Sequence, residues 1–453
     1  MTNARENLRR SAVRTCEIFF ILILLEGVIR KWIFRSFEQP FVLIRDPVLL
    51  VIYAQYIFYI RGRFAGWAII YCVFVLIFAF FIFIQTFYFN FPVTVYLVGV
   101  RNYLAFAPLA FIMPEIYNRR DVNRLILIFL YTTIPVGVLA VFQFYSPVDS
   151  LINQTSDLTS EGIFTVVEGV VRPYGPFSFT LGESTYQSMA LAIGLIALER
   201  RRELRLSSPL LIVFFAAIGS GGVVSGSRTY FVSAGVIFFA YFISAMTSPN
   251  GKAMAKRALS VAFVAVFGVI TMTVVFPKAF ETMMERQAEA DYIEGSNSAR
   301  ALDIGTEVFT IIGDTPVFGH GIGFGSNAGA FLATGDIQFT LAEYDWTRIV
   351  LECGPFLGVI VIMTRVFLTI LAGVLALRAN TRTGDAAPLI LYGFVAPIVF
   401  YSQMSNNNSM ISFGWYSLGL LLTLVAAAKR ANVSRNTRHV GAFSSMVAGG
   451  GPA

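Results

Sequence analysis

Charged side chains are scarce in this chain, and their scarcity decides the class of protein. Asp, Glu, Lys and Arg together make up 13% of the 453 residues, whereas hydrophobic residues make up 56% and phenylalanine alone occurs 44 times. Soluble domains carry about a quarter charged residues. A soluble protein is therefore excluded, and we predict an integral membrane protein.

The chain also has few of the residues that build disulfide frameworks and metal sites. Its three cysteines, Cys16, Cys72 and Cys353, lie in or beside apolar runs without a Cys-x-x-Cys pair, so we interpret them as packing residues. Two histidines, His320 and His439, are too few for a His-rich metal site. We predict neither a metal nor another cofactor. The basic N-terminus lacks the small-residue cleavage site of a signal peptide, which predicts an uncleaved first helix.

Long apolar stretches recur along the chain. A helix needs about 20 predominantly apolar residues to cross the hydrocarbon core of a bilayer. Twelve candidate spans lie near residues 17–34, 46–60, 65–84, 93–113, 125–146, 185–198, 209–225, 229–246, 258–276, 352–377, 387–404 and 411–428. We therefore predict an all-α polytopic membrane protein with about 12 transmembrane helices, in which 209–246 could form a broken helix pair.

The distribution of positive charge predicts the orientation. With the N-terminus inside, the internal segments hold 22 Lys and Arg residues and the opposite side holds ten. Positively charged loops are retained in the cytoplasm. Both termini are therefore predicted to be cytoplasmic in a multi-pass protein of the bacterial inner membrane. The net charge of +7 is explained by these loops, so no nucleic-acid partner is predicted.

This orientation organises the chain. Residues 1–431 form one predicted transmembrane domain, whose long segments 147–184 and 277–346 face the periplasm. The second segment is polar and is predicted to be a large external loop with short helices. Residues 432–453, rich in Ser, Gly and Ala, are predicted to be a disordered cytoplasmic tail.

Five arginines are predicted to lie at or near the external face, where the positive-inside rule makes basic residues uncommon. They are Arg45, Arg101, Arg172, Arg228 and Arg300. Their convergence would be repulsive without an anionic ligand, and arginine suits bidentate recognition of phosphate. We predict that they bind substrate. The alternative for each is snorkelling to lipid headgroups or pairing with a carboxylate.

Acidic residues in two regions carry further predictions. Glu343 and Asp345 lie at the entry to the tenth span, where a carboxylate could act as a general base or cap the helix. We favour a cap for Asp345 while keeping it as a candidate substrate-binding residue, and we name Glu343 as the candidate base. Glu26 in the first span is predicted to form an ion pair with a basic residue of a neighbouring helix.

Two glycine- and asparagine-rich turns are less specific. The run Gly319–Gly325 is neither a dinucleotide-binding nor a P-loop pattern, and it predicts either a tight turn or backbone amides near a ligand. His320 within it is a candidate substrate-binding residue and a second possible base. The run Asn406-Asn407-Asn408 could hydrogen-bond a carbohydrate, or serve only as a polar turn.

Four local stretches resemble the bacterial O-antigen polymerase and O-antigen ligase membrane family, over roughly residues 170–360. They are Arg172-Pro173-Tyr174-Gly175-Pro176-Phe177, Ser225-Gly226-Ser227-Arg228, Arg300 with Thr315-Pro316-Val317-Phe318-Gly319-His320-Gly321, and Glu343 through Glu352-Cys353-Gly354-Pro355-Phe356-Leu357-Gly358. The chain departs from the family where Glu343 occupies the place of the usual histidine.

The resemblance implies metal-independent glycosyl transfer at the outer face of the inner membrane. The donor would be an undecaprenyl-diphosphate-linked oligosaccharide, and the acceptor a glycan or lipid. Arg172, Arg228 and Arg300 would hold the diphosphate, and Glu343 would activate the acceptor hydroxyl. Membrane lipids and other polysaccharide-assembly membrane proteins would be partners. The activity would belong to O-antigen, lipopolysaccharide or exopolysaccharide biosynthesis, as a polymerase or a ligase.

Three other readings remain open from the residues. A secondary transporter or flippase of lipid-linked oligosaccharide would show an internal repeat and charges near the middle of the membrane. A glycosyltransferase related to peptidoglycan polymerases would share the type of donor. A structural membrane subunit would have no need of a large asymmetric loop.

Overall fold

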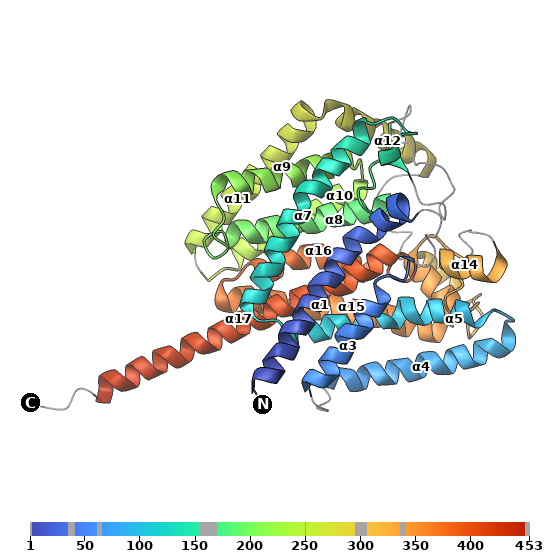
Figure 1. Ribbon diagram of the computed structural model, residues 1–453, viewed down its shortest axis with the longest axis horizontal. Helices are drawn as coiled ribbons and strands as arrows, with labels where there is room; N and C mark the ends of the chain where they lie inside the picture. Colours follow the sequence, from blue (N-terminus) through green and yellow to red (C-terminus); the bar gives the residue numbers. More distant parts are fainter. Residues whose placement is uncertain are drawn as a thin grey trace, which may run out of the picture.

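The protein is a bundle of long helices, as Figure 1 shows. The structure is a computed structural model that describes residues 2–34, 41–60, 66–154, 170–249, 251–294, 306–335 and 341–448. Within these ranges there is no β-strand. The predicted all-α class is therefore confirmed for the described part of the chain.

Seven helical segments of the described chain are long and apolar enough to cross a membrane. They are Gly66–Tyr88, Val93–Ile116, Arg119–Tyr145, Arg228–Met246, Met254–Val275, Asp345–Thr383 and Asn408–Ala431. Shorter apolar helices cover Asp46–Ile60, Ser208–Val224 and Ala387–Tyr401. Large apolar side chains face outward, such as Phe58, Leu76 and Phe83, each more than 60% exposed. Such a surface suits lipid and would aggregate in water.

The helices follow the apolar pattern of the sequence, and each of the twelve stretches named above overlaps a described helix, while the number of twelve membrane spans stays a prediction. The first half contains α1 (Thr2–Val28), η1 (Ile29–Ile33), α3 (Asp46–Ile60), α4 (Gly66–Tyr88), α5 (Val93–Val100), η3 (Arg101–Ala105), α6 (Ala107–Ile116), α7 (Arg119–Tyr145) and η4 (Leu151–Asn153). The second half contains α8 (Thr180–Glu199), α9 (Ser208–Val224), α10 (Arg228–Met246), α11 (Gly251–Ile270), η6 (Thr271–Val275), α12 (Pro277–Glu294), α14 (Asn327–Thr334), α15 (Asp345–Thr383), α16 (Ala387–Tyr401) and α17 (Asn408–Ala448). The stretch 209–246 is indeed two helices, α9 and α10.

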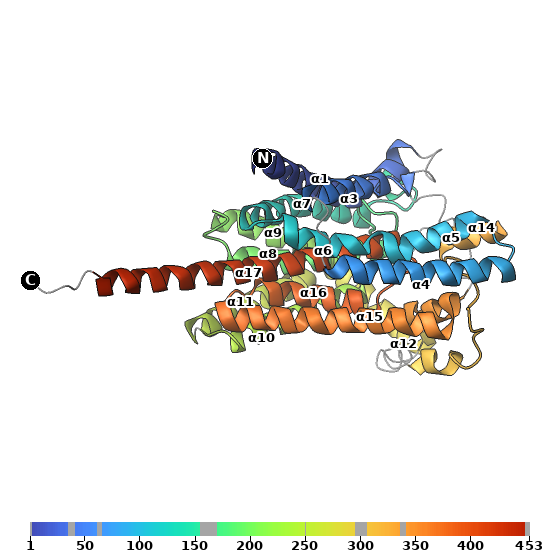
Figure 2. The same cartoon turned by 90° about the horizontal axis from the view of Figure 1, so that it is seen from below.

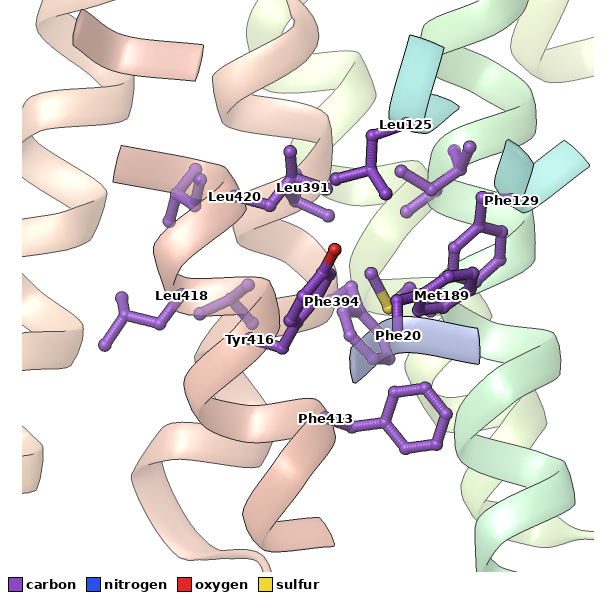
Figure 3. Close-up of a cluster of buried hydrophobic side chains, with 14 of the residues drawn as sticks. Phe20, Leu125, Phe129, Met189, Leu391, Phe394, Phe413, Tyr416, Leu418 and Leu420 are labelled. Atoms are coloured by element: carbon purple, nitrogen blue, oxygen red, sulfur yellow. The ribbon is translucent and has the colours of Figure 1, made fainter. Parts of the chain in front are cut away.

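The core is built around α8, which is buried along nearly its whole length. Phe129 of α7 stacks between Phe20 of α1 and Tyr186 of α8, with ring centroids 4.9 Å and 5.1 Å away. Figure 3 shows Phe20 and Phe129 beside Met189, together with side chains from the last two helices. Offset aromatic pairs of this kind add stability beyond the area that they bury.

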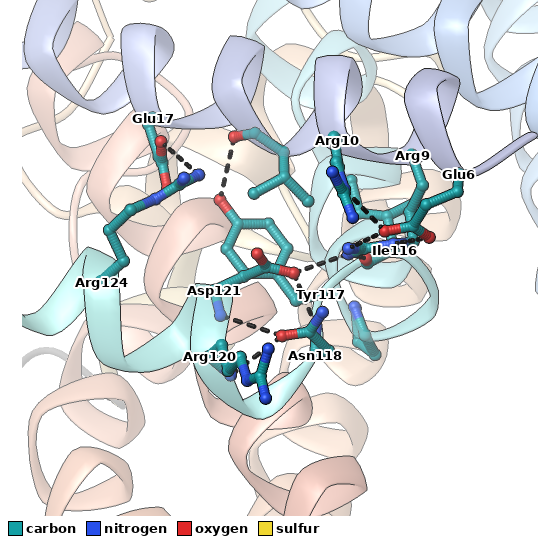
Figure 4. Close-up of polar contacts among 12 residues, drawn as sticks. Glu6, Arg9, Arg10, Glu17, Ile116, Tyr117, Asn118, Arg120, Asp121 and Arg124 are labelled. Atoms are coloured by element: carbon teal, nitrogen blue, oxygen red, sulfur yellow. Dashed lines mark hydrogen bonds and ion pairs between the residues drawn. The ribbon is translucent and has the colours of Figure 1, made fainter. Parts of the chain in front are cut away.

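The start of α1 lies against the connection between α6 and α7. Arg9 donates to the Asp121 carboxylate at 2.6 Å and to the Ile116 carbonyl at 2.7 Å, as Figure 4 shows. Arg430 of α17 donates to the Tyr117 carbonyl of the same connection. The beginning of the first helix and the later part of the last therefore meet at one end of the bundle, which we call the proximal end.

Other predicted internal segments meet at the proximal end. They are joined by Arg119 with Glu203, Arg200 with Asp385, and Arg257 with the Gly384 carbonyl. Arg119 is bidentate to Glu203, at 2.7 and 2.8 Å, and this pairing lowers the pKa of Glu203 to about 2. The segments that the charge distribution assigned to one side thus lie together.

The C-terminal segment differs from its prediction. A disordered tail was expected from residue 432, but α17 remains helical to Ala448 and projects beyond the other helices (Figures 1 and 2). No proline interrupts the sequence before Pro452, and the intervening residues include several alanines and arginines, which favour helix. Polar composition alone therefore misled the prediction.

Candidate functional site at the distal end

We call the end of the bundle opposite the proximal end the distal end. The segment of residues 402–408, which joins α16 to the first residue of α17, lies there, and we call it the turn 402–408. Asp345, at the start of α15, is 2% exposed and points into this turn. One carboxylate oxygen accepts hydrogen bonds from the N–H and the hydroxyl of Ser405. The other accepts hydrogen bonds from the Met404 N–H and from Nη1 of Arg365. The expected cap on α15 is absent, because Tyr344 is the N-cap residue and makes no side-chain cap bond. The Asp345 carboxylate caps the turn instead.

Two of the predicted substrate-binding arginines are tied to the same turn. Arg45 is fully buried and pairs with Glu26 of α1 at 2.5 Å, which confirms the expected ion pair of Glu26 with a neighbouring helix. Arg101 is bidentate to Asp46 and donates to Oδ1 of Asn408 at 2.6 Å. Both arginines are therefore neutralised by carboxylates within the described chain. Pairing with a carboxylate was the alternative to substrate binding that the sequence left open, and both arginines form such pairs.

A second rigid element is the turn of residues 174–178, which follows Arg172 and precedes α8. Lys31 is fully buried, and its ammonium donates to the carbonyls of Gly175 and Phe177 at 2.9 and 2.6 Å. The same ammonium lies 4.2 Å from the centroid of the Tyr174 ring. Gln143 of α7 accepts the Gly175 N–H at 2.7 Å. Lys31 of η1 and Gln143 of α7 thus fix the turn that follows Arg172.

Close backbone approach explains two glycines at this turn. Gly175 has φ +54°, and a Cβ there would lie 2.1 Å from Oε2 of Glu183. A Cβ on Gly27 of α1 would lie 2.2 Å from the Pro176 carbonyl oxygen. Only glycine fits these positions without displacing backbone or a buried carboxylate. Arg172 itself is half-buried.

The glycine run Gly319–Gly325 packs against a break in α15. Gly354 interrupts that helix with φ +79° and ψ 166°. The His320 N–H donates to the Leu351 carbonyl at 2.7 Å, and a Cβ on Gly319 would lie 2.4 Å from the Glu352 carbonyl oxygen. The run is therefore a tight turn inserted beside the break, which agrees with the first of its two predicted roles.

Gln85 fastens this insertion to α4. Its amide donates to the carbonyls of Phe318 and Glu352 and accepts the Ile322 N–H at 2.9 Å. The fully buried Glu352 carboxylate below the run accepts the Tyr103 hydroxyl at 2.7 Å. Sequence reasoning assigned Gln85 and Tyr103 no role. A single carboxamide within the apolar stretch 66–88 was the signal that could have identified Gln85.

Glu343, the candidate base, has an exposed side chain on a constrained backbone. Arg348 is fully buried and donates through Nη2 to the Ala342 carbonyl and, at 3.3 Å, to the Glu343 carbonyl. Nε2 of Gln403 donates to the Glu343 carbonyl at 3.4 Å. The backbone at this position is thus held from both α15 and the turn 402–408, while the carboxylate points away from the protein interior.

The remaining candidates are distributed over the distal end. Arg228 is half-buried and begins α10, directly after the turn of residues 225–227. His320 is half-buried within the glycine run. Arg300 lies outside the described residues. The turn 402–408 gathers Arg45, Arg101, Asp345 and the backbone of Glu343, whereas Arg172 lies in the segment before α8 and Arg228 begins α10.

No group of His, Cys, Asp and Glu with the arrangement of a metal site occurs in the described parts of the chain. A scan against models of protein families and a search of curated proteins both found no match to this chain.

Proposed function

We propose that this protein is a glycosyltransferase of the bacterial inner membrane that uses an undecaprenyl-diphosphate-linked oligosaccharide as donor. It would have about twelve membrane-spanning helices with both termini in the cytoplasm, and its distal end would face the periplasm. The reaction would polymerise repeat units of a surface polysaccharide or transfer them to an acceptor lipid. The proposal rests on the sequence resemblance together with the chemistry available at the distal end.

The observation that carries the proposal is the state of Glu343. Its carboxylate is exposed while its carbonyl is held by Arg348 and Gln403. A base that must meet an incoming hydroxyl needs an accessible side chain on a fixed backbone, because proton transfer requires hydrogen-bond distance in a defined geometry. Other acidic residues of the distal end, such as Asp345 and Glu352, are buried in internal hydrogen bonds.

The proposed chemistry divides between this carboxylate and the arginines. An acceptor hydroxyl oxygen would form a bond to the anomeric carbon of the donor while its proton passes to Glu343. The bond from that carbon to the diphosphate would break, and undecaprenyl diphosphate would leave with the electron pair. Arg172, Arg228 and Arg300 would stabilise the charge on the leaving diphosphate.

The rigid mounting of Arg172 supports this division. The turn that follows it is held by Lys31, Gln143 and the close contact at Gly27. Electrostatic stabilisation is most effective when the donor groups are fixed before the reaction. The neutralised Arg45 and Arg101 are assigned no part in binding the diphosphate and serve the fold.

The proposal is tested by deleting the gene in its host and restoring it with variants. We expect Arg172→Ala and Arg228→Ala to lower polymer formation about 100- to 1,000-fold, as loss of a charge-stabilising donor does. Glu343→Gln should lower it about 100- to 10,000-fold. Arg202→Ala, at an exposed arginine of the proximal end, is the matched control and should restore the parent profile.

The surface polysaccharide is read on a gel beside the amount of protein in the membrane. Loss of the high-mass ladder to single repeat units identifies a polymerase, and full-length unattached polymer identifies a ligase. An unaltered polysaccharide profile in the deletion strain would refute the proposal and favour the transporter. Parent activity in Glu343→Gln would refute the assigned role of that carboxylate.

A further inference from the structure

Three carboxamide side chains belong to or contact the turn 402–408 on the distal surface, and one of them, Gln403, contacts the backbone of Glu343. Gln403 donates to the Glu343 carbonyl, and Oδ1 of Asn406 accepts the backbone N–H of Asn327 at 3.2 Å. Asn327 is the first residue of α14, and Gln403 and Asn406 belong to the turn 402–408. These bonds bring two separate segments and the candidate base onto one patch.

The three consecutive asparagines of that turn are used in different ways. Oδ1 of Asn407 accepts the N–H groups of Ser409 and Met410 and so caps α17. Asn408 is bound to Arg101 through its side chain. Asn406 uses only its oxygen, so the two N–H groups of its amide have no partner among the described residues. The structure thus singles out one asparagine of the run as available for binding.

The neighbouring amides are also incompletely bonded. Oδ1 of Asn327 is buried from solvent and has no hydrogen-bond partner among the described residues. The Gln403 amide makes one bond through its nitrogen, which leaves its oxygen uncommitted within the described chain. Buried polar atoms are normally hydrogen-bonded, and one that is not calls for a ligand, a water or a strained contact as its explanation.

The chemistry of this patch is that of a partner with many hydroxyl groups. A carboxamide offers both donors and an acceptor and carries no charge, so it matches hydroxyls, which also donate and accept. It has none of the positive charge by which the arginines suit a diphosphate. The patch would therefore bind a sugar with its hydroxyl groups, whereas the arginines would bind the diphosphate of the donor.

We propose that Asn327, Gln403 and Asn406 form the subsite for the acceptor sugar, and that they orient its hydroxyl toward Glu343. This inference rests on the proposed glycosyl transfer and adds the group that the acceptor must carry: a neutral, hydroxyl-bearing sugar ring. Asn406 donates to an acceptor hydroxyl, and the uncommitted oxygen of Gln403 accepts from a second one. The carboxylate of Glu343 then takes the proton of the attacking hydroxyl.

The test uses the full-length protein in detergent with the purified lipid-linked donor of its host. The acceptor probe is the single repeating unit released from the host's surface polysaccharide by mild acid. Transfer is measured against acceptor concentration at saturating donor, and against donor concentration at saturating acceptor. A neutral hydrogen bond is worth about 0.5–1.5 kcal/mol, which corresponds to an increase of about 2- to 13-fold in KM.

We expect Asn406→Ala and Gln403→Ala each to raise the acceptor KM by that factor and to leave the donor KM unchanged. Asn406→Asp is the sharper variant, because it keeps the oxygen that binds the Asn327 N–H but removes the donating amide. It should raise the acceptor KM while the unfolding temperature matches the parent. Asn90→Ala, at an exposed asparagine of the distal end, is the control and should change neither KM.

Two results would overturn the inference alone. One is an unchanged acceptor KM in Asn406→Asp and Gln403→Ala while the parent transfers normally. The other is a donor KM that rises as much as the acceptor KM, which would assign the patch to the donor. Absence of transfer by the parent protein would overturn the proposed function, and the acceptor subsite with it.

Discussion

Replacing Gln85 with leucine tests how the distal end is held to the lipid-facing helix α4. Gln85 is fully buried and makes three hydrogen bonds to the glycine run and to the break in α15. Leucine fills a similar volume but leaves the Phe318 carbonyl and the Ile322 N–H without their partner. The Glu352 carbonyl keeps its bond from the Gly321 N–H. The substitution therefore removes the hydrogen bonds that hold α4 to the glycine run and leaves most of the apolar packing in place.

The size of the effect follows from these bonds. Hydrogen bonds between membrane helices average about 0.6 kcal/mol, and each buried backbone group left unpaired costs about 1–3 kcal/mol. Two such groups predict a local loss of about 2–6 kcal/mol, and the weakness of hydrogen bonds between membrane helices favours the lower part of this range, about 2–4 kcal/mol. Because about 1.4 kcal/mol is a factor of ten, the glycine run should separate from α15 roughly 30 to 1,000 times more often.

Cysteine labelling can measure this opening. Cys353 is fully buried directly under the glycine run, and Cys16 is fully buried in the main core. In a Cys72→Ser background, we expect Gln85→Leu to accelerate reaction of Cys353 with N-ethylmaleimide by the factor above. Cys16 should react at the parent rate. Gln55→Leu, at a glutamine of α3 whose amide donates to the Ser11 hydroxyl, should change neither rate.

Two outcomes would refute the reasoning. If Cys353 reacts at the parent rate in Gln85→Leu, the glycine run does not depend on Gln85. If Cys16 accelerates equally, the substitution has loosened the whole bundle, and the local magnitude derived from three hydrogen bonds is wrong.

Two further predictions concern other parts of the fold. Gly323→Ala should lower the unfolding free energy by more than about 3 kcal/mol, because φ is +95° and the new Cβ would lie 2.3 Å from the Val95 carbonyl oxygen. Gly335→Ala, with φ +85° and no atom within 4 Å of its Cβ, should cost only about 1–2 kcal/mol in thermal unfolding in detergent. Equal losses would show that the close approach at Gly323 is unimportant. Glu203→Gln should remove stability that the parent has above pH 4.5 and loses as the pH falls toward 2, since Arg119 lowers the pKa of Glu203. Parallel stability curves for parent and variant over that range would exclude this pairing as a source of acid sensitivity.

The sequence allowed the helical class to be predicted because apolar length is a local property. The stretch 66–88 is apolar throughout except for Gln85 and Thr86, and it forms one helix. The grouping of the predicted internal segments at the proximal end could also be predicted, because the distribution of positive charge indicates which loops lie on the same side. The polar loop was expected to contain short helices, and α12 and α14 lie within it.

The partners of individual side chains could not be predicted in the same way. Asp345 was assigned to its own helix, but its hydrogen bonds reach Ser405, sixty residues away. Arg101 was predicted to bind substrate or, as the alternative, to pair with a carboxylate, and the structure shows it bound to Asp46 and to Asn408, which lies 307 residues away. Both side chains are explained by contacts between distant segments, which a sequence pattern without tertiary information does not contain. The exposure of the Glu343 side chain could be predicted, because this residue lies in a polar loop directly before a helix.

The turn 402–408 also has a consequence for the order in which the protein is made. Arg45 and Arg101 are synthesised early, whereas Asn408, which both of them bind, belongs to the last pair of helices. Asp345 likewise waits for Ser405. During translation, these buried charges must therefore remain incompletely bonded until the final hairpin enters the membrane. A chain that stops before residue 402 lacks these hydrogen-bond partners, so the last hairpin completes the bonding of Arg45, Arg101 and Asp345.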